Sequence, residues 1–464
     1  MAFLIGGANS DSGAYQINNS VRLEDGDSPE LSFSVNESPT HQDKGTWSFW
    51  IKRGNILSAV ARIFSAYADS GATQTWIRLD ADDKLDICNR VSSSNNTRLV
   101  TNRVFRDPSA WYHIVVAFDT SDGTAGDRVK LYVNGQKQTS LGTATYPSQN
   151  DDLEGNTNGI PHSWGCDGVN NDEYFDGYLS EVHFVDGAQK VATDFGEVND
   201  NGVWVPKAYR SSYGTNGYRL QFRQTGTSAN ASGIGADTSG NDKHFTLTNL
   251  AAIDVAIDTP TNNFATLNPA NKFVSPVVSK GNLEYDSNSS SGSSMVSTIA
   301  PANGKWYVEI KAVTSTIHIG VAEVGLDSFR SKGQGGSRPN INYQYGGGVE
   351  IDGSNVDSEA TFTSDDIIGF ALNLDDGELI IYKNGTALNS GTAYNLHTNT
   401  THGNTGFSVQ TATGSGNTKA SFNFGSPAHA ISSGNTDANG YGNFEYTVPT
   451  NYYALCTKNL AKYG

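Results

Sequence analysis

Two stretches, one in each half of the chain, have nearly the same sequence pattern. They read "LYVNGQKQTSLGTA" and "IIYKNGTALNSGTA". In each stretch a strand of aromatic and aliphatic residues runs into Asn-Gly, at Asn134-Gly135 and at Asn384-Gly385. Asn-Gly is the dipeptide that most readily adopts the two positive φ angles of a type I′ hairpin. Because a strand ending in acidic turn residues precedes each copy, we expect one such hairpin in each of two β-sandwiches.

The composition favours an all-β fold with more than one domain. The chain has 464 residues, which is more than one hydrophobic core usually serves. Gly occurs 50 times and hydrophobic residues make up only 36%, a balance typical of short strands and turns rather than of long helices.

Alternating segments predict half-buried antiparallel strands. In "GTWSFWIKRG" the residues Trp47, Phe49 and Ile51 lie on one side and are expected to point inward. In "YFDGYLSEVHFVDGAQ" the parity of the inward residues changes between Leu179 and Val182, which predicts a β-bulge.

Four segments follow from the position of these strands and of the turn-rich stretches. We expect a first sandwich over residues 1–257 and a second over 276–435. The Pro, Asn and Thr content of residues 258–275 indicates a linker. Residues 436–464 are too aromatic for a loose tail, so we expect them to pack back onto a domain.

Charge and cysteine usage exclude several classes of partner. The formal net charge is −17 and no run of Lys or Arg occurs, so we expect neither nucleic acid nor an anionic membrane as a partner. No stretch approaches the ~20 apolar residues of a membrane-spanning helix. The N-terminus has no basic residue before Arg22, so a signal peptide is not expected. The three cysteines, Cys88, Cys166 and Cys456, are too few and too scattered for a disulfide framework.

The ordered segments resemble known families. "GTWSFWIKRG", "AWYHIVVAFDT" and "YFDGYLSEVHFVDG" together look like a laminin-G or pentraxin-type concanavalin A-like jelly roll. "GKWYVEIKA", "IHIGVAEV" and "DIIGFALNLDDGELIIYKNG" are similar to a SPRY domain, another concanavalin A-like sandwich. More narrowly, "MAFLIGGANS", "DFGEVNDNGVWVPKAYRSSYGTNGYRLQF" and "FEYTVPTNYYALCTKNLA" resemble structural proteins of tailed bacteriophages.

The resemblance implies a non-enzymatic virion surface protein, such as a fibre, knob or decoration of head or tail. Its partners would be other virion proteins and a host-surface glycan, bound for host attachment. That role implies a homo-oligomer, for which a trimer is one arrangement, so that many weak sites act together. A virion protein assembles in the host cytoplasm and needs no signal peptide. A secreted bacterial lectin or adhesin is the alternative.

A glycoside hydrolase is the second alternative, because concanavalin A-like sandwiches also house such enzymes. Those enzymes need two carboxylates that flank the cleaved bond. The one near match is "GGGVEIDGSNVDSE", where Glu350 and Asp352 would share a strand face. Position 354 is Ser, so the third acid of the expected pattern is missing. We therefore expect no catalytic residues.

We expect no cofactor, and a structural calcium ion is the one alternative left open. The laminin-G resemblance implies an ion at a loop rim, held by Asp side chains and backbone oxygens. The candidate ligands are Asp80, Asp82 and Asp83. A second acidic group, in "CDGVNNDEYFDG", does not have the fixed spacing of a calcium loop either.

Three aromatic residues are candidates for carbohydrate binding. A sugar packs its C–H surface on an aromatic face beside polar hydrogen-bonding groups. Trp164 is expected in the turn-rich stretch "PHSWGCDG", and Tyr343 and Tyr345 at a loop-to-strand junction in "SRPNINYQYGGG". Ordinary packing in the core is the competing interpretation for all three.

Overall fold

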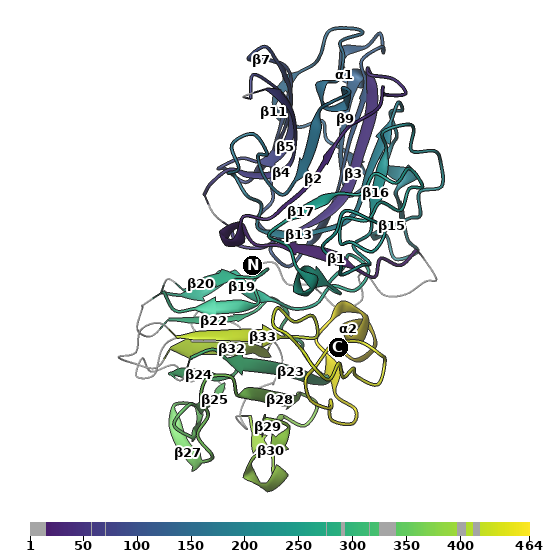
Figure 1. Ribbon diagram of the computed structural model, residues 1–464. Coiled ribbons are helices and arrows are strands. Elements are labelled where there is room, and N and C mark those ends of the chain that lie inside the picture. The colour runs from purple at the N-terminus through teal and green to yellow at the C-terminus, as the bar shows by residue number, and fades with distance from the viewer. Residues whose placement is uncertain are drawn as a thin grey trace. The chain divides into compact units, whose positions relative to one another are not determined.

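The chain forms two units, and both are built from β-sheets (Figure 1). The prediction of an all-β fold with two concanavalin A-like antiparallel sandwiches is confirmed. The start of the chain, where no signal peptide is expected, lies outside the part that the structure describes. The computed structural model describes residues 15–56, 58–69, 71–274, 276–288, 293–314, 316–323, 340–396, 405–411 and 418–464.

The first unit, up to residue 261, contains two large antiparallel sheets. The described strands of one sheet are, in spatial order, β10 (Gln136–Lys137), β9 (Val129–Val133), β8 (Trp111–Asp119), β3 (Lys44–Arg53), β13 (Gly177–Asp186), β1 (Ser20–Leu23) and β18 (Val255–Ala256), with β16 (Tyr218–Leu220) also paired to β13. Those of the other are β11 (Leu141–Thr145), β7 (Ser94–Val104), β6 (Lys84–Val91), β5 (Thr73–Leu79), β4 (Ala61–Asp69), β12 (Pro161–Trp164), β2 (Glu30–Ser34) and β17 (Thr246–Thr248). A separate ribbon pairs β14 (Gly196–Val198) with β15 (Trp204–Pro206).

Because side chains alternate between the two faces of a strand, every second side chain lies between these sheets. Trp47, Phe49 and Ile51 all lie in the core, as predicted. The register of β13 against β3 shifts between Ser180 and His183, which confirms the predicted bulge.

The expectation of half-buried strands is wrong for β3, β8 and β13, which are buried on both faces. Segments that follow the last long strand cover the outer face of their sheet. Phe195, Tyr209 and Tyr213 form one apolar cluster there with Val115 of β8. A second cluster contains Ile17, Trp50, Trp111, Tyr178 and Ala256.

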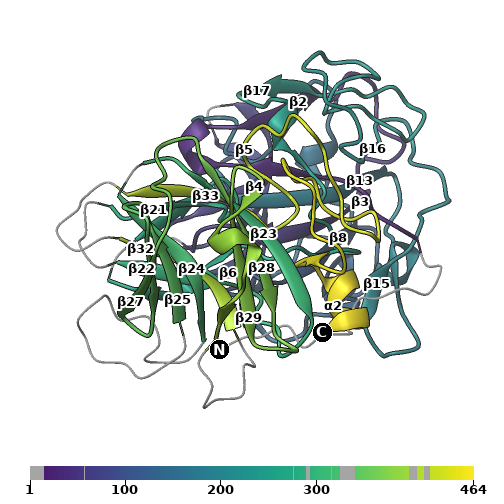
Figure 2. The same ribbon diagram turned by 90° about the horizontal axis from the view of Figure 1, so that it is seen from below.

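The second unit, residues 262–464, also contains two sheets, whose strands can be followed in Figure 2. The described strands of one are β19 (Leu267–Phe273), β22 (Ser294–Ser297), β32 (Thr405–Thr411), β24 (Ile317–Glu323), β25 (Asn340–Gln344), β26 (Gly348–Ile351) and β27 (Ser354–Ser358). Those of the other are β20 (Val277–Ser279), β21 (Glu284–Asp286), β33 (Lys419–Asn423), β23 (Lys305–Ala312), β28 (Ile367–Asn373), β29 (Glu378–Lys383) and β30 (Thr386–Ala387), with β31 (Tyr394–Asn395) on β29 and β34 (Tyr453–Ala454) parallel to β23.

Helices are few and short. They are α1 (Ala125–Arg128), α2 (Thr457–Tyr463) and the 3-10 turns η1 (Asp25–Asp27), η2 (Glu154–Asn156), η3 (Ala192–Asp194), η4 (Ala252–Asp254) and η5 (Asn389–Gly391). Within the described ranges, no helix combines the length and the apolar character needed to cross a membrane.

Of the stretch 258–275, expected as a linker, the structure describes residues 258–274, and these fold into the two units instead. Asp258 is buried in the first unit, where its carboxylate pairs with Lys52. Leu267 is buried in the core of the second unit, in strand β19. The unit boundary therefore falls between residues 261 and 262.

The C-terminal residues 436–464 contact the second unit through a buried carboxylate. Glu309 of β23 is fully buried, and its two oxygens accept the backbone N–H groups of Glu445 and Tyr446, each at 2.8 Å. Burial is the main cause that raises the pKa of Glu309. These hydrogen bonds fix the segment that precedes β34.

Both Asn-Gly pairs form the predicted hairpins. Asn134 and Gly135 have φ angles of 47° and 80°, and Asn384 and Gly385 have 48° and 78°. The hairpins join β9 to β10 and β29 to β30. An aromatic ring covers each turn, because a Cβ atom at Gly135 would lie 2.4 Å from the ring of Trp204.

We expect Gly135→Ala to destabilise the first unit more than Gly240→Ala. Both glycines have positive φ, which costs about 1–3 kcal/mol for a residue with a side chain. Gly240 faces open space, whereas Gly135 faces Trp204, and this ring also packs against Gly196 and cannot retreat. Overpacking adds about 1–3 kcal/mol. Urea unfolding followed by tryptophan fluorescence measures the difference, since six of the seven tryptophans precede residue 262. Equal losses would show that Trp204 does not cover the turn.

The stability of the first unit should fall below pH 6.5 because of His113. Its Nδ1 accepts a hydrogen bond from Trp204 Nε1 at 3.1 Å, and its Nε2 lies 2.9 Å from Ser48 Oγ. Burial, with a smaller contribution from His183, lowers the pKa of His113 to about 3. Between pH 6.5 and about 3 the unfolded chain therefore binds one proton more than the folded chain.

The free energy of unfolding should then decrease by up to about 1.4 kcal/mol per pH unit from this group as the pH falls through that window. His113→Gln should reduce this slope, while the same change at exposed His41 should not. Urea unfolding at several pH values checks the prediction, and an unchanged slope in His113→Gln would contradict it.

Candidate ligand cleft and acidic cluster

An open cleft of about 540 Å³ lies on the outer face of the sheet that contains β2. Leu31 of β2 points into the core, so its neighbours Glu30 and Ser32 point outward into the cleft. The other lining residues are Phe33, Ser34, Tyr67, Pro161, Gly168, Asn171, His244 and Thr246. We call this feature the β2 cleft.

Tyr67 brings an aromatic ring to the β2 cleft. It lies on β4, one position after the core residue Ala66, and is half-buried. A Cβ atom at Gly168 would lie 2.7 Å from the ring, so the missing side chain lets the loop approach it. Burial, followed by the charge of Glu30, raises the pKa of Tyr67. The phenol therefore stays protonated at neutral pH and is able to donate a hydrogen bond.

Polar groups flank this ring. Glu30 accepts a hydrogen bond from Ser163 Oγ at 2.6 Å, which fixes its carboxylate at the cleft. Asn171 is exposed, and its φ of 54° places it at a tight turn. His244 Nδ1 accepts the backbone N–H of Asp237 at 3.0 Å, so Nε2 carries the proton. An aromatic ring beside a carboxylate, an amide and an imidazole suits a sugar.

Two of the aromatic residues singled out in the sequence are buried. Trp164 does not lie in a loop but ends strand β12, is fully buried, and donates from Nε1 to Tyr218 Oη at 3.0 Å. Tyr343 lies within β25, is fully buried, and donates to the carbonyl of Ala360. Neither ring presents a face to solvent. Tyr345, 37% exposed, is accessible and lies near the ring of His318.

Two acids of the turn between β5 and β6, which were candidate ligands, have partners within the protein. Asp83 is buried and pairs with Arg53 Nη1 at 3.1 Å and Arg106 Nε at 2.7 Å. Asp80 accepts the backbone N–H groups of Asp82 and Lys84, each at 2.9 Å. Arginine side chains thus neutralise Asp83, and backbone N–H groups donate hydrogen bonds to Asp80. The second acidic group of the sequence is similar, because Asp167 pairs with Arg62.

The two acids considered for catalysis, Glu350 and Asp352, do not lie on the same strand. Glu350 is buried in β26, whereas Asp352 lies beyond the strand in the turn to β27 with a φ of 51°.

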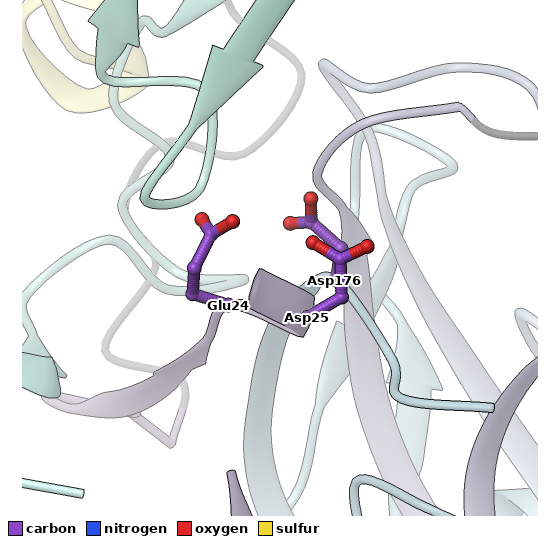
Figure 3. A group of neighbouring side chains, drawn as sticks. All are labelled: Glu24, Asp25 and Asp176. Atoms are coloured by element: carbon purple, nitrogen blue, oxygen red, sulfur yellow. The ribbon is translucent and has the colours of Figure 1, made fainter. Parts of the chain in front are cut away.

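A different acidic cluster forms where β1 and β13 meet. These strands pair in antiparallel register with Leu23 opposite Gly177. Glu24 and Asp25, which follow β1, therefore meet Asp176, which precedes β13. One carboxylate oxygen of each residue lies within 4.8 Å of the other two, and Figure 3 shows the three carboxylates turned toward one another.

Asp176 is the buried member of this cluster. It is 5% exposed, and its Oδ1 has no hydrogen-bond partner. A Cβ atom at Gly54 would lie only 2.0 Å from Oδ1, so the glycine creates the space that the carboxylate occupies. Burial, followed by the charges of Glu24 and Asp25, raises the pKa of Asp176 well above its usual range.

A cavity of about 370 Å³ adjoins the cluster. Asp25 and Asp176 line it together with Arg53, Asn55, Ala59, Val60, Ala61, Glu173 and Tyr174. The nearby guanidinium of Arg53 forms hydrogen bonds with other groups. Its Nη1 donates to Asp83 Oδ1 at 3.1 Å and to the carbonyl of Phe105 at 3.0 Å. The sequence offers no local signal for this cluster, because the register of distant strands creates it.

Each unit contains a domain of a known type. The model of the concanavalin A-like lectin/glucanases superfamily, laminin G type, matches residues 25–193, and the SPRY domain model matches residues 305–427. The chain thus contains a laminin G-type domain followed by a SPRY domain, as the sequence motifs indicated. A comparison with curated proteins finds no match.

Several solved structures are similar in parts. The heptameric SAP-like pentraxin from Limulus polyphemus is 19% identical, with 38% of this chain and 80% of that chain covered and a TM-score of 0.28. The SPRY domain of human HERC1 is 14% identical, with 34% and 96% covered and a TM-score of 0.30. Domains LG4-5 of the mouse laminin alpha1 chain are 8% identical, with 90% and 89% covered and a TM-score of 0.28.

Proposed function

We propose that this chain is a non-enzymatic surface protein that binds a glycan in the β2 cleft. The observation that carries the proposal is the cleft itself: about 540 Å³, open, and lined by Tyr67 beside Glu30, Asn171 and His244. The domain that holds it belongs to a superfamily of lectins and glucanases, which supports a carbohydrate as the ligand class.

The single carboxylate among the described residues of the cleft supports binding rather than hydrolysis. Glycosidases use two carboxylates on either side of the scissile bond. Among the described residues that line the β2 cleft, Glu30 is the one carboxylate, and Ser163 already donates to it.

We expect Tyr67→Ala to weaken glycan binding about five- to tenfold, because an aromatic contact contributes about 1–1.5 kcal/mol. Tyr67→Phe keeps the ring and should retain most of the affinity. A glycan array identifies an oligosaccharide for wild type, and isothermal titration calorimetry then compares the variants on it. Tyr345→Ala serves as the second arm, since Tyr345 is the exposed aromatic candidate of the SPRY domain.

Two results would contradict the proposal. Loss of binding in Tyr345→Ala with full binding in Tyr67→Ala would move the site to the second unit. Release of reducing sugar from the bound polysaccharide, abolished by Glu30→Gln, would show an enzyme.

We also propose a virion as the place where this surface acts, on the strength of the resemblance to tailed-phage structural proteins. There the chain would contact other virion proteins and attach to a host-surface glycan as a homo-oligomer, whose many copies compensate for weak single sites.

The virion setting predicts that peptides of this chain occur in purified phage particles at a stoichiometry typical of a structural component. Quantitative mass spectrometry of the particles measures it. Detection only in the medium of bacteria that carry no phage would favour a secreted adhesin.

A further inference from the structure

The charged groups of the β2 cleft are all acidic. Glu30 is the one carboxylate among the described lining residues, and none of those residues is Lys or Arg. His244 also lines the cleft, and its Nε2 lies 3.8 Å from a carboxylate oxygen of the exposed Asp242. Because its Nδ1 accepts the backbone N–H of Asp237, this imidazole is neutral and offsets neither charge. A ligand in the cleft therefore meets a negative potential.

The loop of Asn171, which borders the cleft, adds to this potential. Asp167 and Glu173 of the loop pair with the buried guanidinium of Arg62, at 3.3 Å and 2.7 Å, whereas Asp172 is exposed. Burial, followed by the charges of Asp167 and Glu173, raises the pKa of Asp172. The two paired carboxylates thus still act on their neighbour, and the loop remains negative.

Lys243 precedes His244 in the sequence but balances a different carboxylate. It is buried, and its Nζ lies 2.5 Å from Glu37 Oε1 and donates to Asn36 Oδ1 at 3.0 Å. The positive charge of this lysine is therefore placed to offset Glu37 rather than Glu30.

We propose that the β2 cleft selects sugars that carry a free, protonated amine, such as the unacetylated hexosamines of a polysaccharide. This inference rests on the proposed glycan binding and names the class of glycan. The sugar ring would pack on Tyr67, and its ammonium group would donate to Glu30. Glu30 Oε1 accepts the hydroxyl of Ser163, and no described residue donates to Oε2, which leaves this oxygen for the ligand. The same potential disfavours sugars that carry a carboxylate.

A basic peptide is the other source of an ammonium group. The aromatic ring of Tyr67 beside the carboxylate favours the sugar, because the C–H surface of a hexose packs on such a face. The match of this unit to a superfamily of lectins and glucanases favours it as well.

The experiment uses the full chain and trimers of β-linked glucosamine, N-acetylglucosamine and glucose. Isothermal titration calorimetry at low salt measures the Kd of each trimer. We expect the glucosamine trimer to bind about tenfold more tightly than the other two, because a hydrogen bond to a charged group is stronger than one between neutral groups. This preference should shrink at about 1 M salt, where the Debye length is only about 3 Å.

Glu30→Gln tests the source of the preference. The ratio of the Kd values for the N-acetylglucosamine and glucosamine trimers should fall to about one, because the amide keeps the shape of the side chain and removes its charge. Thr246→Lys places a cation at an exposed position of the cleft and should also lower this ratio, which keeps the inference testable if Glu30→Gln does not fold.

Glu197→Gln is the matched control. It removes the same charge at an exposed position of β14 and does not belong to the lining of the cleft, so the ratio should stay as in wild type. A preference that Glu30→Gln and Tyr67→Ala both leave unchanged would be a general attraction to an acidic chain and would overturn the inference.

The remaining outcomes separate this inference from the proposed glycan binding. If the neutral trimers bind as tightly as the glucosamine trimer and Tyr67→Ala weakens them, the glycan site stands and the selection of amino sugars is overturned. If no oligosaccharide binds at all, both fail. A trilysine peptide that binds as tightly as the glucosamine trimer, and depends on Glu30 but not on Tyr67, would overturn the sugar in favour of a basic peptide.

Discussion

The buried ion pair between Lys52 and Asp258 requires the first unit to include the chain as far as Asp258. Its Nζ and Oδ2 atoms are 2.7 Å apart, and both side chains are 1% exposed. Removing two charges from water costs several kcal/mol per ion, so the pair is tolerated only where further polar groups complete it. Trp111 Nε1 donates to the other carboxylate oxygen at 3.1 Å, and Ser20 Oγ donates to the backbone carbonyl of Asp258 at 2.7 Å. The chain must therefore stay in this unit until it has passed Asp258, which is why the boundary falls after residue 261 rather than before 258.

Features decided by neighbouring residues could be predicted from the sequence. The Asn-Gly turns, the inward side chains of β3 and the bulge in β13 depend only on local backbone preference and on alternation. The burial of both faces of β8 could not be predicted in this way, because the residues that cover Val115, namely Phe195, Trp204 and Tyr209, come from a stretch without alternation. Their aromatic character was the available signal, and only the tertiary structure shows which face they cover.

The candidate sites also differ in whether neighbouring residues or the tertiary structure decides them. Gly165 and Gly168 after Trp164 favour a loop, whereas the alternation of His162 and Trp164 is typical of core residues in a strand, and both are buried. The acids Asp80, Asp82 and Asp83 lie close together in the sequence and favour an ion site. The two arginines that pair with Asp83 come from elsewhere in the chain, and no pattern within this turn predicts them. Conversely, the acids that do converge are separated by most of the first unit. Strand pairing unites them, and a pattern within one segment does not encode that pairing.

The repeated Asn-Gly hairpin is best explained by its structural role, which is the same in both units. In each copy the Asn Oδ1 accepts a backbone N–H at 2.8 Å from the strand that pairs with the first strand of the hairpin. The donor is His113 of β8 in the first unit and Ile367 of β28 in the second. Each bare glycine then receives an aromatic ring from a later segment, Trp204 in one unit and Tyr446 in the other. A type I′ turn with glycine leaves backbone that a flat ring is able to cover, and the ring ties the later segment to the sheet. The segments after the last long strands are thus part of each sandwich. The shared motif secures the two folds, and neither copy contributes a residue to the β2 cleft or to the acidic cluster.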